Sequence, residues 1–182
     1  MTTAVLLAAG KSHRTSGLKQ LYRVEGEYLV NLQIRRLRSY GFNVAVVLGY
    51  KAETIQKILD KKVTVIFNEM YEEGMFSSVK KAFLHLDSEA LLFCHVDRPV
   101  PDPAVFHALL HTDAEVAVAS YKGRKAPPLY IHASAKNRLL HTSLKRLDHW
   151  VSSEEGVAYV EVDDPKVHWN ANSDEALKRY FG

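Results

Sequence analysis

The fold is decided by the stretch AVLLAAGKSHRTSGLK, residues 4–19. It opens with an apolar run of strand length, and Gly10 follows this run closely. Because glycine has no Cβ, it lets backbone come close to a ligand and can adopt positive φ without steric cost. Ser12, Arg14 and Lys19 then offer a hydroxyl and two cations to a ligand with several negative charges, such as a triphosphate. The stretch therefore predicts a strand that leads into a phosphate-binding loop.

Two common phosphate-binding patterns are absent from the chain. No G-x-x-x-x-G-K-[ST] and no G-x-G-x-x-G occurs, so neither a P-loop ATPase nor a Rossmann dehydrogenase is indicated. The nine histidines show no metal-ligand spacing such as H-E-x-x-H.

Beyond residue 19, apolar runs of strand length alternate with segments of helical period. Strands are expected at residues 4–8, 44–48, 63–67, 91–94, 116–119, 129–131 and 157–162, and helices at 29–40, 52–59, 75–86, 103–111 and from about 173. Asp102 and Ser173 are expected to cap the last two of these helices. The alternation predicts an α/β fold of three layers: a mostly parallel sheet with helices on both faces. We expect one domain over residues 1–182, in which the second half inserts into the sheet and returns to it.

The composition is that of an ordinary soluble protein, and it excludes several classes of function. The 182 residues carry a formal net charge of +3 with no basic block, so neither nucleic acid nor a membrane is an expected partner. No signal peptide is visible, and no apolar run reaches the ~20 residues that span a bilayer, so we expect a cytoplasmic protein. Cys94 is the single cysteine and lies in an apolar run, which favours a core residue.

Polar residues follow three of the expected strands, and in a parallel sheet these strand ends share one edge. Asp97 comes directly after the strand at 91–94, where a carboxylate is a natural ligand for Mg²⁺. Ser78 lies at the start of a helix, where a hydroxyl can read the polar edge of a base. The alternatives stay open: Asp97 could only terminate its strand, and Ser77 and Ser78 could only cap their helix.

The N-terminal stretch resembles the signature L-A-A-G-x-S-x-R-x-x-x-x-K of nucleotidyltransferases with a GT-A-like fold. Among these it is most similar to the MobA/MocA group, which attaches a nucleotide to molybdopterin. The matching positions, which the resemblance marks as nucleotide-binding, are Leu7, Ala8, Ala9, Gly10, Ser12, Arg14 and Lys19. The resemblance covers nearly the whole chain, with the later motifs in family order.

The resemblance also implies roles for individual residues. The segment from Asn68 to Val79 is similar to N-x-x-[WY]-x-x-G-M-x-S-S-[LV], which adds Gly74 and Ser78 to the nucleotide site. Asp97 stands in a motif like G-D-x-P, and Asn172 in one like D-x-D-T-P-E-D-L, so these two residues would hold Mg²⁺ or Mn²⁺. The catalytic residues would be Asp97 with Arg14 and Lys19, the two cations stabilising the α-phosphate and the leaving pyrophosphate.

The function implied by the resemblance is transfer of CMP from CTP to a phosphate-bearing acceptor, with molybdopterin or its molybdenum cofactor as the favoured acceptor and a molybdoenzyme as a further partner. The L-A-A-G form, with Met75 and Ser78, favours CTP over GTP. Several residues depart from the family pattern: Val96, Ala126, Pro127, Asn170 and Asn172. Two alternatives therefore stay open, namely a sugar or isoprenoid phosphate as acceptor, and a non-catalytic protein that binds and delivers a nucleotide or cofactor.

Overall fold

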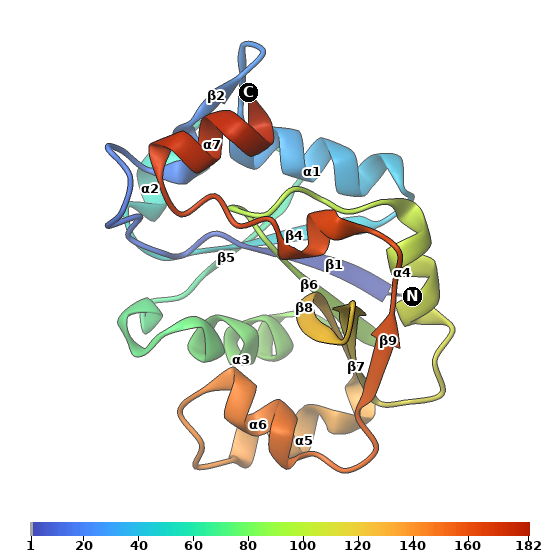
Figure 1. Ribbon diagram of the computed structural model, residues 1–182. Coiled ribbons are helices and arrows are strands. Elements are labelled where there is room, and N and C mark those ends of the chain that lie inside the picture. The colour runs from blue at the N-terminus through green and yellow to red at the C-terminus, as the bar shows by residue number, and fades with distance from the viewer. Residues whose placement is uncertain (1) are drawn as a thin grey trace.

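The computed structural model describes residues 2–182, and its centre is a seven-stranded sheet of order β5-β4-β1-β6-β8-β7-β9 (Figure 1). Every neighbouring pair is parallel except those of β8, which runs antiparallel to both β6 and β7. The strands are β1 (Thr2–Leu7), β4 (Asn43–Leu48), β5 (Thr64–Phe67), β6 (Ala90–His95), β7 (Val116–Tyr121), β8 (Arg124–His132) and β9 (Ala158–Glu161). The prediction of a mostly parallel sheet is confirmed.

Helices cover both faces of this sheet, as predicted. The α-helices are α1 (Leu29–Ser39), α2 (Ala52–Gln56), α3 (Met75–His85), α4 (Pro103–Leu110), α5 (Lys136–His141), α6 (Leu147–Ser153) and α7 (Asp174–Phe181). In Figure 1, α1 and α7 lie on one side of the sheet, and α3, α5 and α6 lie on the other. Short 3₁₀ helices are η1 (Lys19–Leu21), η2 (Tyr71–Glu73), η3 (Ala133–Ala135) and η4 (Pro165–His168).

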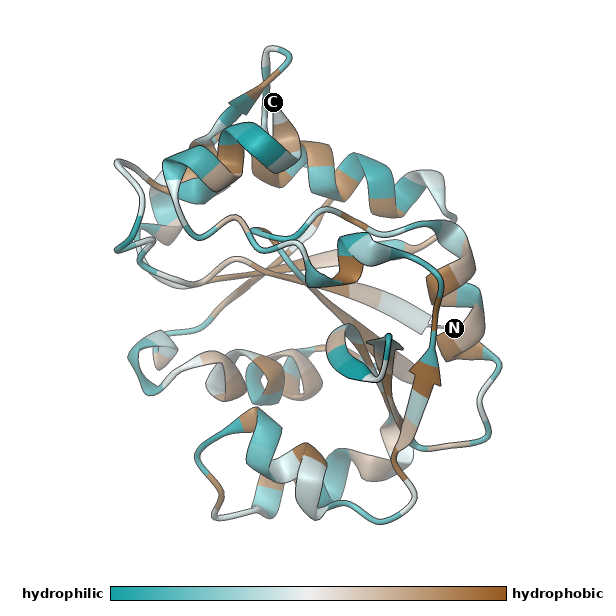
Figure 2. Cartoon of the chain, in the orientation of Figure 1, coloured by the Kyte–Doolittle hydropathy of each residue, from teal (hydrophilic) through white to brown (hydrophobic). Residues whose placement is uncertain are grey.

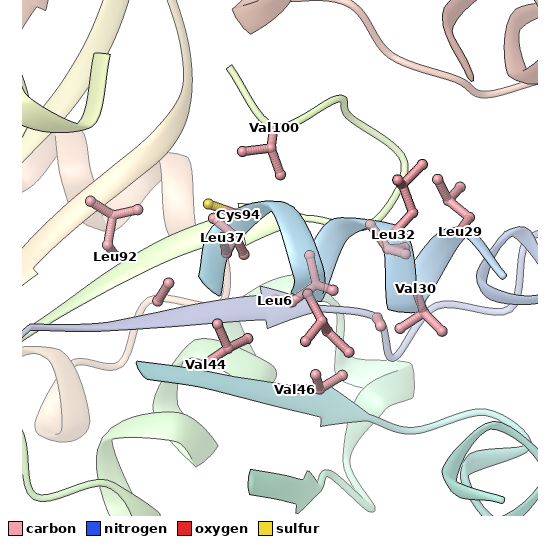
Figure 3. Packing of buried hydrophobic residues seen from close by; sticks show 14 of the residues in the cluster. Leu6, Leu29, Val30, Leu32, Leu37, Val44, Val46, Leu92, Cys94 and Val100 are labelled. Atoms are coloured by element: carbon pink, nitrogen blue, oxygen red, sulfur yellow. The ribbon is translucent and has the colours of Figure 1, made fainter. Parts of the chain in front are cut away.

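The side chains of strand β1 belong to two separate hydrophobic cores, because successive side chains of a strand point to opposite faces of the sheet. Ala4 and Leu6 belong to the cluster that packs under α1, α4 and α7, whereas Val5 and Leu7 belong to the cluster over α3 and α6. Figure 3 shows Leu6 among the α1 and β4 side chains of the first cluster, and Figure 2 shows the hydrophobic colouring along the central strands. The near-continuous apolar run therefore reflects burial on both faces.

Three local details differ from the sequence predictions. Asp102 does occupy the N-cap position of α4, but its carboxylate makes no cap hydrogen bond and instead accepts from Lys166 Nζ at 2.6 Å. A short hairpin of β2 (Arg23–Val24) and β3 (Glu27–Tyr28) was not predicted from the sequence. Helix α2 ends at Gln56, three residues before the expected end at 59, because i→i+3 bonds tighten its last turn.

Other predictions are confirmed. Ser173 caps α7, since its Oγ accepts a hydrogen bond from the backbone N–H of Ala176 at 3.1 Å. Cys94 is buried in the core, and burial raises the pKa of its thiol. Among residues 2–182, no helix is both long enough and apolar enough to cross a bilayer.

Candidate functional site

A cavity of about 250 Å³, here the first cavity, lies where β1 and β6 end and α3 begins. Nine of the predicted site residues line it: Leu7, Ala8, Ala9, Gly10, Ser12, Lys19, Gly74, Ser78 and Asp97. Four further residues line it that the sequence analysis did not assign to the site, namely Gln20, Tyr71, His95 and Val96. Met75, which the sequence analysis used only to favour CTP over GTP, lines it as well. These residues lie together because the parallel strands β1 and β6 end at the same edge of the sheet, which is where ligands bind in such sheets.

The loop after β1 is shaped differently from the sequence expectation. The positive φ lies at Ser12, at 57°, and not at Gly10. A Cβ built on Gly10 would meet no atom within 4 Å, so the missing side chain leaves space open in the cavity. Buried Gln20 holds the loop, because its Nε2 donates to the carbonyl oxygens of Ala8 at 2.7 Å and Gly10 at 3.2 Å. The conformation of Gly10 is therefore ordinary, and the close approach of a ligand to its backbone stays a prediction.

Lys19 joins the two predicted metal ligands. Its Nζ donates to Asp97 Oδ2 at 2.8 Å and to Asn172 Oδ1 at 2.8 Å. The side chain of Lys19 is 9% exposed and that of Asp97 is 23% exposed, so water screens this pair only partly. At an effective dielectric of about 20, the gross attraction of two unit charges at this separation is about 6 kcal/mol. Two oxygen atoms from distant parts of the chain thus already converge on one cation.

The chain segment before α7 is what brings Asn172 to this point. The backbone N–H of Ala171 donates to the carbonyl oxygen of Asp97 at 2.8 Å, which fixes the segment beside the end of β6. The neighbouring Asn170 is not bonded to Lys19, and its buried Oδ1 has no hydrogen-bond partner within residues 2–182. Of the two asparagines, Asn172 is therefore the one that accompanies Asp97.

The donor set suits a small, hard cation. A carboxylate and an amide oxygen are ligands that Mg²⁺ and Mn²⁺ accept, and both atoms here already bind the lysine ammonium. Within the described part of the chain, no group of three or more His, Cys, Asp and Glu side chains could hold a metal ion. A metal at this point would thus need most of its ligands from phosphate oxygens and water.

Ser78 also lines the cavity, where it is buried and receives a hydrogen bond from Asn68. The Nδ2 of Asn68 donates to Ser78 Oγ at 2.9 Å and to Ser77 Oγ at 2.8 Å. Neither serine caps α3 through its side chain, and the N-cap residue is Gly74, at φ 99°. Since Ser78 Oγ accepts from Asn68, its own proton is free to donate to a ligand. The alternative that these serines only cap the helix is wrong.

Arg14 was predicted to be a site residue, but the structure places it outside the lining of the first cavity. Its side chain is exposed. Nearby, the backbone N–H of Ser16 lies 3.1 Å from both carboxylate oxygens of Asp174, so the loop is tied to the first turn of α7. The loop that carries Arg14 is therefore held by a contact between residues 158 positions apart in sequence.

Tyr71 forms part of the cavity wall because a glycine makes room for it. A Cβ on Gly49 would lie 2.5 Å from Tyr71 Cβ and 2.9 Å from the carbonyl oxygen of Ala9. Lys11 forms an ion pair with Glu72, and its Nζ lies 5.6 Å from the centre of the Tyr71 ring. No signal in a single sequence marks Gly49, since its importance depends on a neighbour that folding brings to it.

His95 lies at the junction of the first cavity with a second, larger one. The second cavity has a volume of about 480 Å³ and shares Gly74, Met75 and His95 with the first. Burial lowers the pKa of His95 to about 4, although the nearby Asp97 carboxylate opposes the shift. The imidazole is therefore neutral at pH 7 and can either donate or accept a hydrogen bond.

The family model of the MobA-like NTP transferase domain matches residues 4–159. No curated protein sequence matches the chain.

Solved structures show the same fold. Rv0371C from Mycobacterium tuberculosis, in complex with manganese, is 20% identical with a TM-score of 0.81, over 99% of this chain and 97% of that one. A nucleotidyl transferase from Methanothermobacter thermautotroptrophicus is 20% identical with a TM-score of 0.84, over 100% and 96%. Molybdopterin-guanine dinucleotide biosynthesis protein A from Archaeoglobus fulgidus is 18% identical with a TM-score of 0.78, over 100% and 97%.

The family model covers most of the chain, and the similar structures share its whole architecture. The chain is therefore a nucleotidyltransferase and belongs to the family of the MobA-like NTP transferase domain.

Proposed function

We propose that this nucleotidyltransferase moves CMP from CTP to a phosphate of an acceptor and releases pyrophosphate, with molybdopterin or its molybdenum cofactor as the favoured acceptor. The observation that carries the proposal is the convergence of Lys19, Asp97 and Asn172 at the edge of a cavity walled by the glycine loop. We take residues 1–182 as one nucleotidyltransferase domain. A cytoplasmic location and a molybdoenzyme partner stay predictions from the sequence.

In the proposed reaction, a phosphate oxygen of the acceptor attacks the α-phosphorus of CTP. A new P–O bond forms, and the bond from the α-phosphorus to the oxygen that bridges to the β-phosphorus breaks. The electron pair of the broken bond leaves with pyrophosphate. Because the attacking phosphate is already ionised at pH 7, the reaction depends on positioning and on neutralising charge, with no need for a side-chain nucleophile.

We assign Lys19 to the charge of the triphosphate. Its ammonium, now shared by Asp97 and Asn172, is within reach of the cavity that the phosphates would enter. Arg14 would supply a second cation, brought in by movement of its exposed loop. Asp97 and Asn172 would hold Mg²⁺ or Mn²⁺, which when bound would neutralise phosphate charge as a Lewis acid.

The base-reading role rests on Ser78. Its hydroxyl accepts from Asn68 and can donate onward, and cytosine presents ring-nitrogen and carbonyl acceptors to such a donor. Ala9 lies in the cavity wall at the position that favours CTP in the resemblance described above. The neighbouring Met75 also lines the cavity, where its flexible side chain can pack on a base.

The proposal is tested by measuring pyrophosphate release with each of the four ribonucleoside triphosphates, Mg²⁺ or Mn²⁺, and molybdopterin. We expect release with CTP, and a loss of at least ~10²-fold in Asp97→Asn, which keeps the side-chain size but removes the charge. Asp163→Asn, an exposed aspartate away from both cavities, is the matched control and should behave as wild type. Release with another nucleotide would reject CTP, and no release with molybdopterin would reject this acceptor.

A further inference from the structure

The second cavity is built from segments that the first cavity does not use. Besides the shared Gly74, Met75 and His95, its walls come from the start of α3, from β7 and β8, and from α6. These elements lie together on the side of the sheet that α3, α5 and α6 cover (Figure 1). The two cavities therefore adjoin, and a molecule in the second would reach the first past His95.

The chemistry of the second cavity is divided between an apolar wall and a polar rim. The buried side chains in its wall are apolar, among them Phe76, Leu129 and Val151, and the partly buried Val118 and Leu147 add to them. The charged residues are all exposed, namely Glu73, Lys125, Lys145, Arg146 and Asp148. Of the residues that line this cavity, His95 is thus the polar side chain that is not exposed.

A bulge in β8 adds to the apolar wall. The register with β7 jumps from Ala119 opposite Ala126 to Val118 opposite Leu129, so the two intervening prolines of β8 are not paired. Proline has no backbone N–H to give to the ladder, which explains why the pairing breaks at this point. Pro127 lines the cavity as a result. Pro127 is one of the departures from the family pattern, so this part of the wall is particular to the chain.

We propose that the second cavity holds the body of the acceptor, and that it selects a phosphate monoester carried on an apolar or flat aromatic body over one carried on a polyol. This inference rests on the proposed function, because it takes the acceptor phosphate to lie near His95 and Asp97, where the two cavities meet. Each polyol hydroxyl buried against carbon without a partner would lose its hydrogen bonds to water, which weakens binding. An apolar or aromatic body would instead gain from burial.

The test is a calorimetric titration with two probes, 1-naphthyl phosphate and glycerol 3-phosphate, with Mg²⁺ and a non-reactive CTP analogue present. We expect 1-naphthyl phosphate to bind at least tenfold more tightly than glycerol 3-phosphate. Leu147→Glu should weaken naphthyl phosphate binding at least tenfold, and the isosteric Val118→Thr should weaken it about threefold or more. Leu84→Glu is the control, since Leu84 is 63% exposed on α3 and lines neither cavity. Thermal unfolding of each variant verifies its fold, and Val118→Thr keeps the test valid if Leu147→Glu is unfolded.

Three results would overturn the inference: equal binding of the two probes, no binding of naphthyl phosphate by the wild type, or wild-type binding in folded variants of the cavity wall. Measuring pyrophosphate release with CTP and molybdopterin, on the same preparations, separates this inference from the proposed function. A protein that binds naphthyl phosphate as expected but transfers no nucleotide to any acceptor would fail the proposed function alone. A protein that releases pyrophosphate with CTP but prefers a polyol phosphate would fail this inference alone.

Discussion

Replacing Gly49 by alanine should disturb the first cavity from outside it. The new Cβ would lie 2.5 Å from Tyr71 Cβ, 2.7 Å from Tyr71 Cγ and 2.9 Å from the carbonyl oxygen of Ala9. Ordinary contacts between carbon atoms are about 3.5–4.0 Å, so the colliding atoms have to move apart by roughly 1 Å. The flexible end of a side chain cannot absorb this, because the atoms concerned are a Cβ and a backbone oxygen. Tyr71 and the loop around Ala9 must therefore move, and both line the cavity.

The size of the effect follows from overpacking, which lowers the free energy of unfolding by about 1–3 kcal/mol. For a chain of this length, each kcal/mol lowers the melting temperature by about 2–4 °C, so Gly49→Ala should lower it by about 2–12 °C. We also expect the dissociation constant for CTP to rise about tenfold, equivalent to about 1.4 kcal/mol, because a wall of the cavity is displaced. Thermal unfolding and calorimetric titration with CTP measure the two quantities.

Gly17→Ala, in the loop after β1, is the matched control. A Cβ on Gly17 meets nothing within 4 Å, and its φ is not positive, so neither quantity should change appreciably. In a Tyr71→Gly background, most of the colliding atoms are gone, and Gly49→Ala should cost less than it does in the wild type. The reasoning is refuted if Gly49→Ala matches Gly17→Ala in both melting temperature and CTP affinity.

Three further perturbations have definite expected outcomes. Lys19→Met should slow pyrophosphate release by about 10²-fold or more, because it removes the cation assigned to the triphosphate; a rate within threefold of wild type would contradict that role. Asp174→Ala should raise the KM for CTP and cost about 0.5–1 kcal/mol of stability, since it frees the glycine loop and removes a carboxylate from the α7 N-terminus, whereas Glu175→Ala should leave KM unchanged. An NMR titration should find the pKa of Asp148 at about 2, because Arg146 donates to its carboxylate, and Arg146→Gln should return it toward 3.8. This depressed pKa stabilises the fold above pH 3.8, and the contribution disappears as pH falls through 2, although solvent screens this exposed pair strongly. An unchanged Asp148 pKa in Arg146→Gln would contradict the pairing.

The parts of the molecule that were predicted correctly depend on patterns local in sequence. The strand that contains Leu6 is a continuous apolar run, and Ser173 stands directly before a helical period, so both are visible without a structure. The glycine loop and Asp97 follow strands of a parallel sheet, and topology alone then brings them to one edge. The α/β fold and the parallel sheet were predicted on this basis, whereas the nucleotidyltransferase family was predicted from the resemblance of the N-terminal stretch to the family signature.

What the sequence analysis missed depends on partners that only folding brings together. Asp102 is a good capping residue in a capping position, but Lys166 competes for its carboxylate from 64 residues away. The importance of Gly49 lies in the approach of Tyr71, and Gly49 itself stands in no motif that the sequence analysis identified. Arg14 matches a family signature, yet its exposed position shows that the loop in this structure does not bring it to the cavity. Such contacts are properties of tertiary packing, which local patterns do not specify.

The insertion of antiparallel β8 between β6 and β7 has a consequence for how such a protein can evolve. The first cavity is lined by residues between 7 and 97, whereas the second takes most of its wall from residues between 118 and 152. Exchange of this later segment between related genes would replace the lining of one cavity and leave the glycine loop, Ser78 and Asp97 in place. The second cavity could therefore change its ligand during evolution while the first cavity keeps its own. A chimera that exchanges residues 116–153 would reproduce such a change in the laboratory.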